Sequence, residues 1–125
     1  SGIDAELTRQ RGVVDAVLAA ARNGDFAALL ALLDPDVVVR ADDEAVQVGA
    51  ARGVRGAAAV AEQFSGRARA ARPALVNGAA GAAWAPVGQP RVVFDFTIRH
   101  GKIVAIDILA DPERLRQLAL VILDD

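Results

Sequence analysis

The sequence predicts an α+β domain in which helices come first and strands follow. Three observations support this class. Apolar residues recur at spacings of three and four up to residue 22, a β-branched run stands at Val37–Val39, and apolar and polar residues alternate from Val92 to Arg99. Helical periodicity followed by runs of strands is typical of α+β domains, not of alternating βαβ units. We therefore expect a curved antiparallel sheet that wraps the helices.

The helices are predicted from apolar periodicity and from residues that end or cap a helix. Asn23-Gly24 ends the first helix, and the Asp25 carboxylate can cap the second. Asp34-Pro35 breaks the second helix, because the residue before a proline avoids the helical region. A polar loop that contains glycine is expected at 43–55. The three helices are placed at residues 6–22, 26–33 and roughly 56–70.

The strands are predicted from β-branched runs, period-two alternation and turn residues. Asn77-Gly78 is a favoured two-residue hairpin turn, and His100-Gly101 marks another tight turn. Asp111-Pro112 opens a short C-terminal helix, with aspartate as the cap and proline at the first position. The strands are placed at residues 37–42, 73–76, 79–85, 92–99 and 102–109, and the last helix at 112–118. The tail 119–125 is open between strand, helix and disorder.

Composition excludes several classes of function. The 125 residues, 54% of them apolar, suit one domain with a core of its own. The chain has no cysteine and a single histidine, His100, which excludes disulfides, thiolate chemistry and multi-histidine metal sites. We expect neither a cofactor nor a metal. The net charge is −2, and the arginines Arg67, Arg69 and Arg72 are assigned to a solvated face, not to nucleic acid.

No stretch approaches the roughly 20 apolar residues that a membrane-spanning helix needs, and no signal segment opens the chain. We therefore expect no membrane contact and predict a cytoplasmic location. The whole chain, residues 1–125, is expected to form one domain.

Several segments resemble the NTF2-like superfamily. Gly24-Asp25-Phe26 stands between the first two helices, and Leu33-Asp34-Pro35-Asp36-Val37 precedes the first strand. The SnoaL-like branch of this superfamily includes polyketide cyclases and ketosteroid isomerases. The resemblance implies a cone-shaped fold with a pocket between the sheet and the helices.

A closer resemblance, which covers nearly the whole chain, is to the SnoaL-like domain at the C-terminus of extracytoplasmic-function RNA polymerase sigma factors. It rests on the segments 14–22, 75–81 and 101–115. It implies a fragment of a longer sigma factor that docks on the sigma regions of its own chain. Those regions would contact RNA polymerase and promoter DNA, and the domain itself would contact no nucleic acid.

Two motifs of that sigma-factor family are associated with docking. The first is a glycine-rich loop with aspartate and lysine after the first strand, and here Asp42, Asp43 and Glu44 stand there without the glycines or the lysine. The second is an Asn-Pro-Asp-Lys-Leu stretch, which survives in altered form. The candidate docking residues are thus Asp42, Asp43, Glu44, Asp111, Pro112, Glu113, Arg114 and Leu115.

The resemblance also implies candidate pocket residues, which suit a small apolar ligand. They are Arg40, Phe64, Trp84, Phe94, Phe96 and Asp107. Aromatic side chains such as these belong to the core more often than they form a ligand-binding surface, and Arg40 can instead extend to solvent. A sensor that binds a small molecule is therefore kept as an alternative to docking.

An enzyme is the third alternative. A carboxylate in an apolar pocket can serve as a base, because burial raises its pKa. Asp107 lies in an otherwise apolar strand and Asp42 ends the first strand, so these two are the catalytic candidates for an isomerase, cyclase or hydratase. The simpler interpretation makes Asp107 a solvated edge or interface residue and Asp42 a capping residue, and we expect no enzyme. By analogy with the superfamily, the open sheet face, which includes Val93 and Thr97, also offers a surface for a homodimer.

Overall fold

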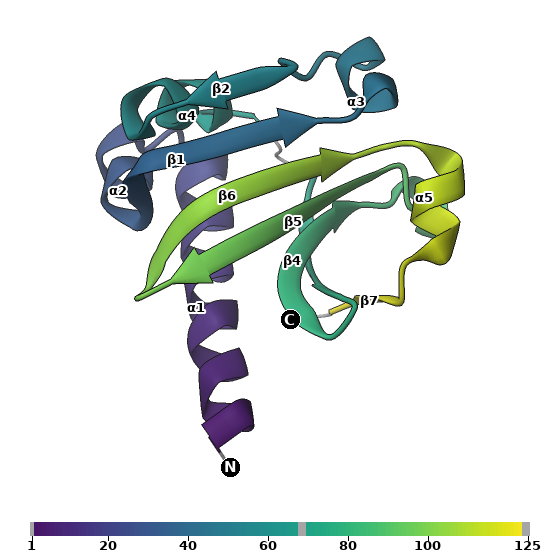
Figure 1. Cartoon of the computed structure of the whole chain (residues 1–125), viewed down its shortest axis with the longest axis horizontal. Coiled ribbons are helices and arrows are strands. Elements are labelled where there is room, and N and C mark those ends of the chain that lie inside the picture. The colour runs from purple at the N-terminus through teal and green to yellow at the C-terminus, as the bar shows by residue number, and fades with distance from the viewer. Residues whose placement is uncertain (1, 68–69, 124–125) are drawn as a thin grey trace.

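The computed structural model describes residues 2–67 and 70–123, which form one curved sheet with helices packed against it (Figure 1). The helices are α1 (Gly2–Arg22), α2 (Phe26–Leu32), α3 (Asp43–Gln47), α4 (Ala57–Phe64) and α5 (Pro112–Gln117), with a short 3-10 turn η1 (Pro86–Gly88). The strands are β1 (Leu33–Ala41), β2 (Gly53–Arg55), β3 (Arg72–Val76), β4 (Ala79–Trp84), β5 (Val92–Arg99), β6 (Lys102–Leu109) and β7 (Leu120–Ile122).

The seven strands lie in the order β2-β1-β6-β5-β4-β3-β7. The expected α+β class and curved sheet are confirmed. Neighbouring strands are antiparallel except for β1 and β6, which run parallel. The parallel pair is sterically possible because the long segment between these strands lets the chain return to the same end of the sheet. The consequence is that β1 and β6 both end at the edge where α3 and α5 lie (Figure 1).

The structure corrects three predicted boundaries and one predicted loop, and it decides the tail, which the sequence left open. The first strand, β1, starts at Leu33 instead of 37. The first helix starts at Gly2, four residues before the predicted 6, and α4 ends at Phe64 instead of 70, because Gly66 adopts a positive φ of 76°. The segment predicted as a loop at 43–55 contains α3 and β2, and β2 pairs antiparallel with β1. In the tail, residues 120–122 form β7 on the edge of β3.

The inner face of the sheet carries the main core. Val37 and Val39 of β1, Ile106 of β6 and Phe96 of β5 pack there against the helices. Val14 of α1, Leu29 of α2 and Val60 of α4 are at most 1% exposed and meet them from the other side. Each such side chain contributes roughly 1.5–3 kcal/mol when buried, so this layer holds the helices on the sheet.

The outer face is divided into a covered and an open part. At the covered part, Val93, Leu109 and Val76 form a second, smaller apolar cluster, so Val93 is buried and does not lie on an open face as predicted. This cluster is covered by the C-terminal segment. The covering side chains are Leu115 on α5, Leu118 just after it, and Leu120 and Ile122 of β7. Two layers of apolar packing therefore fix β5 and β6, and the open part of the outer face begins where this cover ends.

Candidate functional site

A cavity of about 210 Å³ opens between the inner face of the sheet and the segment that joins β1 to α4. Its floor is formed by side chains of the central strands, namely Val39, Val92, Phe94 and Ile108. Phe64 of α4 closes one side and meets the Phe94 ring edge-on, with centroids 6.2 Å apart. The rest of the wall is apolar residues or glycine from α3, the following turn and β2: Ala45, Val48, Gly49, Ala50, Ala51 and Val54.

Gln63 and Arg67 are the polar side chains that line this cavity, and no carboxylate or histidine of the described residues lines it. Gln63 lies at the end of α4 and Arg67 lies in the turn that follows, four residues later. The backbone N–H of Arg67 donates to the Phe64 carbonyl, 3.0 Å away, which holds the turn against the helix. The cavity is therefore apolar with one cationic and one amide group at its wall.

Asp42 joins the cavity wall to the C-terminal helix. Its Oδ1 accepts a hydrogen bond from the Ala45 N–H at 2.8 Å, which caps α3. Its Oδ2 accepts from the Ala110 and Asp111 N–H groups at 2.9 and 3.0 Å. Burial acts to raise the pKa of Asp42, but the N–H groups of Asp111, Ala45 and Ala110 and the charge of Arg114 outweigh it and hold the pKa below its ordinary value.

The candidate docking residues form one surface at this end of the sheet. Asp43 and Glu44 lie in the first turn of α3, where Arg52 donates to Asp43 at 2.7 Å. Asp111 caps α5 by accepting from the Arg114 N–H at 3.0 Å. Pro112, Glu113 and Arg114 are exposed, whereas Leu115 is half-buried against the smaller apolar cluster. The two motifs, 68 residues apart in the sequence, are thus joined by the Asp42 carboxylate.

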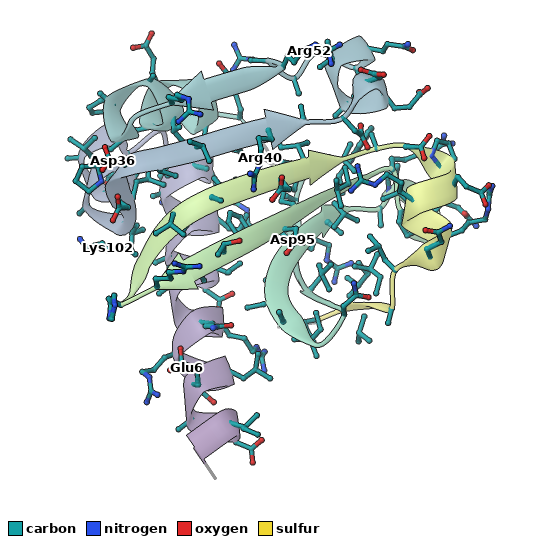
Figure 2. The ribbon with its side chains drawn as sticks, viewed as in Figure 1. Glu6, Asp36, Arg40, Arg52, Asp95 and Lys102 are labelled. Atoms are coloured by element: carbon teal, nitrogen blue, oxygen red, sulfur yellow. The ribbon has the colours of Figure 1, made fainter. Side chains whose placement is uncertain are left out.

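A charged row crosses the open part of the outer face. Arg40 lies opposite Asp107 in register, and Asp107 lies opposite Asp95. The Arg40 guanidinium donates to both oxygens of Asp107, from Nε at 2.9 Å and from Nη2 at 3.1 Å. Figure 2 shows Arg40 and Asp95 on the face turned away from α1. Burial, and secondly the nearby charge of Asp107, raises the pKa of Asp95.

The structure separates the six residues predicted for the pocket. Phe64 and Phe94 line the cavity. Arg40 and Asp107 lie on the opposite face of the sheet, because side chains alternate along a strand and their neighbours Val39 and Ile108 point inward.

The other two predicted pocket residues are also placed away from the cavity wall. Phe96 is 7% exposed within the main core, and Trp84, 41% exposed, stands at the end of β4. Asp42 lies beside the cavity, but its oxygens are used by backbone N–H groups. Neither catalytic candidate therefore reaches into this cavity.

Sequence reasoning missed Gln63, Arg67 and the wall formed by residues 48–54. Gln63 and Arg67 are four residues apart, the spacing that puts two side chains on one side of a helical segment. Ala50, Ala51 and Val54 interrupt the polar loop with apolar residues. Together these signals could have indicated an inward-facing wall.

No group of three or more histidine, aspartate or glutamate side chains among residues 2–67 and 70–123 is placed to hold a metal ion. Within the same residues, none of the helices has the length and apolar character needed to span a bilayer. Arg69, one of the arginines noted above, lies outside the described residues.

Comparison with solved structures finds an NTF2-like fold. The chain superposes on the extracytoplasmic function sigma factor SigJ of Mycobacterium tuberculosis with a TM-score of 0.66 and 31% identity, covering 86% of this chain and 44% of that one. An NTF-2 like protein of unknown function from Burkholderia xenovorans gives a TM-score of 0.56 at 18% identity, covering 88% and 93%. A putative polyketide cyclase from Sinorhizobium meliloti gives 0.50 at 23%, covering 78% and 93%.

No protein-family model matches the sequence, and no curated protein matches it either. The chain spans less than half of the sigma factor, 44% of its length. The other two structures share less than 25% identity and show the fold alone. The helices, the curved unclosed sheet and these neighbours together establish that the chain has the NTF2-like cone fold.

Proposed function

We propose that this chain is a regulatory domain of an extracytoplasmic-function sigma factor and that it acts by docking on the sigma regions of its own parent chain. Those regions contact RNA polymerase and promoter DNA in the cytoplasm, and the domain sets how freely they do so. The observation that carries the proposal is the likeness to the sigma factor SigJ, at 31% identity over 86% of this chain.

The arrangement of the two docking motifs supports this proposal. Asp42, in the first motif, binds the backbone at Ala110 and Asp111, where the second motif starts. Both segments therefore belong to one surface that can meet a partner as a unit. Arg114 is exposed on α5, and Asp43 and Glu44 lie on α3, so the surface presents charges of both signs. Mixed charge gives orientation to a docked partner.

We further propose that the domain binds its partners without catalysing a reaction. General acid–base catalysis needs a titratable group within reach of the substrate. The wall of the cavity is supplied by apolar side chains and glycine together with Gln63 and Arg67. Asp107 is paired with Arg40 on the other face of the sheet, and Asp42 accepts hydrogen bonds from three backbone N–H groups.

The test is transcription by the parent protein with an altered docking surface. Arg114→Glu reverses an exposed charge on α5, and Arg99→Glu, at the end of β5, is the matched control. Loss of one interface charge contact is worth about 1 kcal/mol, or roughly five-fold in an equilibrium. We expect run-off transcription from a promoter of the parent protein to change about five-fold with Arg114→Glu and to stay constant with Arg99→Glu. Equal transcription by all three proteins, with folding confirmed by circular dichroism, would contradict docking through α5.

A further inference from the structure

Two polar side chains in the cavity wall select one class of ligand. Thirteen residues line it, and all but Gln63 and Arg67 are aliphatic, phenylalanine or glycine. An apolar body would therefore fill most of the cavity, and removal of that body from water would drive binding. The ligand's polar group would have to lie where Gln63 and Arg67 line the wall.

Arg67 carries a charge that the described residues leave uncompensated. Its side chain forms no ion pair with the carboxylates of residues 2–67 and 70–123, in contrast to Arg52, which donates to Asp43 at 2.7 Å. The Gln63 amide likewise has no hydrogen-bond partner in this part of the chain. A guanidinium and an amide donor in the wall of one apolar cavity suit a carboxylate, since hydrogen bonds between ions are shorter and stronger than neutral ones.

The volume of the cavity also limits the size of the ligand. The cavity of about 210 Å³ is below the roughly 300–1,000 Å³ of pockets for drug-sized molecules. We propose that this cavity binds a small apolar monocarboxylic acid, with the carboxylate on Arg67 and Gln63 and the hydrocarbon part between Phe64, Phe94 and Ile108. This inference concerns the cavity alone, so it can fail while docking through α5 holds, and the reverse.

Three probes of equal chain length separate the head group from the tail. Octanoate, 1-octanol and octylamine are titrated into the 125-residue chain, and binding is measured as the shift of the melting temperature, because a ligand of the native state must stabilise it. We expect a concentration-dependent rise with octanoate, a smaller rise with octanol, and the smallest with octylamine, whose charge meets Arg67. No rise with octanoate, or equal rises with octanoate and octanol, would overturn the proposal.

Two variants locate the site. Arg67→Gln removes the charge and keeps the fold, because the Arg67 side chain is exposed. It should weaken octanoate binding about tenfold and leave octanol unchanged. Arg99→Gln, on the far end of β5 from Val92 and Phe94, should change neither. Ala51→Leu, which adds volume at the wall, should weaken both probes. If Arg67→Gln and Arg99→Gln affect octanoate equally, the carboxylate does not bind at Arg67 and the proposal is wrong.

Discussion

At the scale of single residues, Asp42 not only ends a strand but also holds two separate segments together through its carboxylate. One carboxylate satisfies three backbone N–H groups on two separate segments. These hydrogen bonds replace the solvation that the carboxylate loses by burial, which is why its pKa falls despite that burial. Asp42 is thus a positioning residue for both the cavity wall and α5.

Asp42→Asn should destabilise the chain by about 1–2 kcal/mol at pH 7, because an amide cannot accept as many N–H groups and is uncharged. The pKa of Asp42 is lower in the folded chain than in the unfolded chain. Its stabilisation is therefore present above the unfolded value of about 3.9 and is lost as pH falls through the folded value. Urea unfolding at pH 7 and at pH 3 measures this. A gap between wild type and variant that is as large at pH 3 as at pH 7 would contradict the assigned charge effect.

Asp95 is expected to behave in the opposite way. Its pKa is raised by burial and by the cross-strand neighbour Asp107. Since the folded chain holds this proton more tightly than the unfolded chain, stability falls as pH rises from about 4 through the raised value. Asp95→Asn should therefore stabilise the chain at pH 7 by about 0.5 kcal/mol, in the range of a like-charge cross-strand pair, with no gain at pH 3. Thermal melts at both pH values decide this, and a loss of stability at pH 7 would show that the Asp95 charge is favourable.

Gly81 is required by close packing of β4. A Cβ at this position would lie 2.8 Å from the Phe94 carbonyl oxygen and 2.8 Å from Val76 Cγ2. Gly81→Ala should cost about 1–3 kcal/mol, as overpacking does in other cores. Gly12→Ala is the matched control, because the space around Gly12 in α1 is empty and alanine favours a helix by roughly 0.5–1 kcal/mol. Denaturant unfolding should move in opposite directions for the two variants, and a stable Gly81→Ala protein would mean that β4 can shift.

At the scale of elements, α5 and β7 depend on few contacts. α5 has six residues, none of them fully buried, and its cap is the Asp111 side chain. β7 has three residues and pairs with β3 alone. Short elements of this kind are the first to open in native-state exchange, because little apolar surface holds them.

Asp111→Ala should therefore speed amide hydrogen exchange in residues 112–122 about five-fold, which corresponds to a cap worth about 1 kcal/mol. The exchange of Val17 and Leu18 in α1 should not change, since they lie in the main core. Asp25→Ala, which removes the equivalent cap of α2, is the control and should leave 112–122 unaffected. Equal effects of both variants on all segments would indicate that α5 opens only with the whole domain.

The elements show where sequence reasoning succeeds and where it stops. The alternation of Val92, Phe94, Phe96 and Ile98 predicts which side chains of β5 face the core, because successive side chains of a half-buried strand point to opposite faces of the sheet. Asp107 was ambiguous because Ala105 and Leu109 on its own side are also apolar. That side is covered at Leu109 by α5 and β7, a tertiary contact that no local pattern encodes.

The cavity could not be predicted from the sequence, because it too depends on tertiary contacts. Its wall is made of segments that become neighbours only when β1, β5 and β6 pair, so Ala50, Val54 and Arg67 carry no joint signal in the sequence. The α+β class, by contrast, follows from local periodicities and was predictable. The parallel pairing of β1 with β6 was not, because it depends on the path of the chain between them.

At the scale of the whole molecule, the fold places two distinct surfaces at one end. Asp42 caps α3, whose Ala45 lines the cavity, and accepts hydrogen bonds at Ala110 and Asp111, so it links the cavity wall to the candidate docking residues on α3 and α5. The fold alone is compatible with many functions, as its likeness to a sigma factor and to a putative polyketide cyclase illustrates.

The central claim, that this chain is the docking domain of a sigma factor, is tested most directly by the reading frame upstream of Ser1. The account predicts an open frame that continues into helical segments ending in a helix-turn-helix, with the parent protein binding RNA polymerase core in a pull-down. A start codon immediately before this segment, with no such regions, would contradict it. The cavity and its proposed carboxylate ligand would then become the basis for assigning a function.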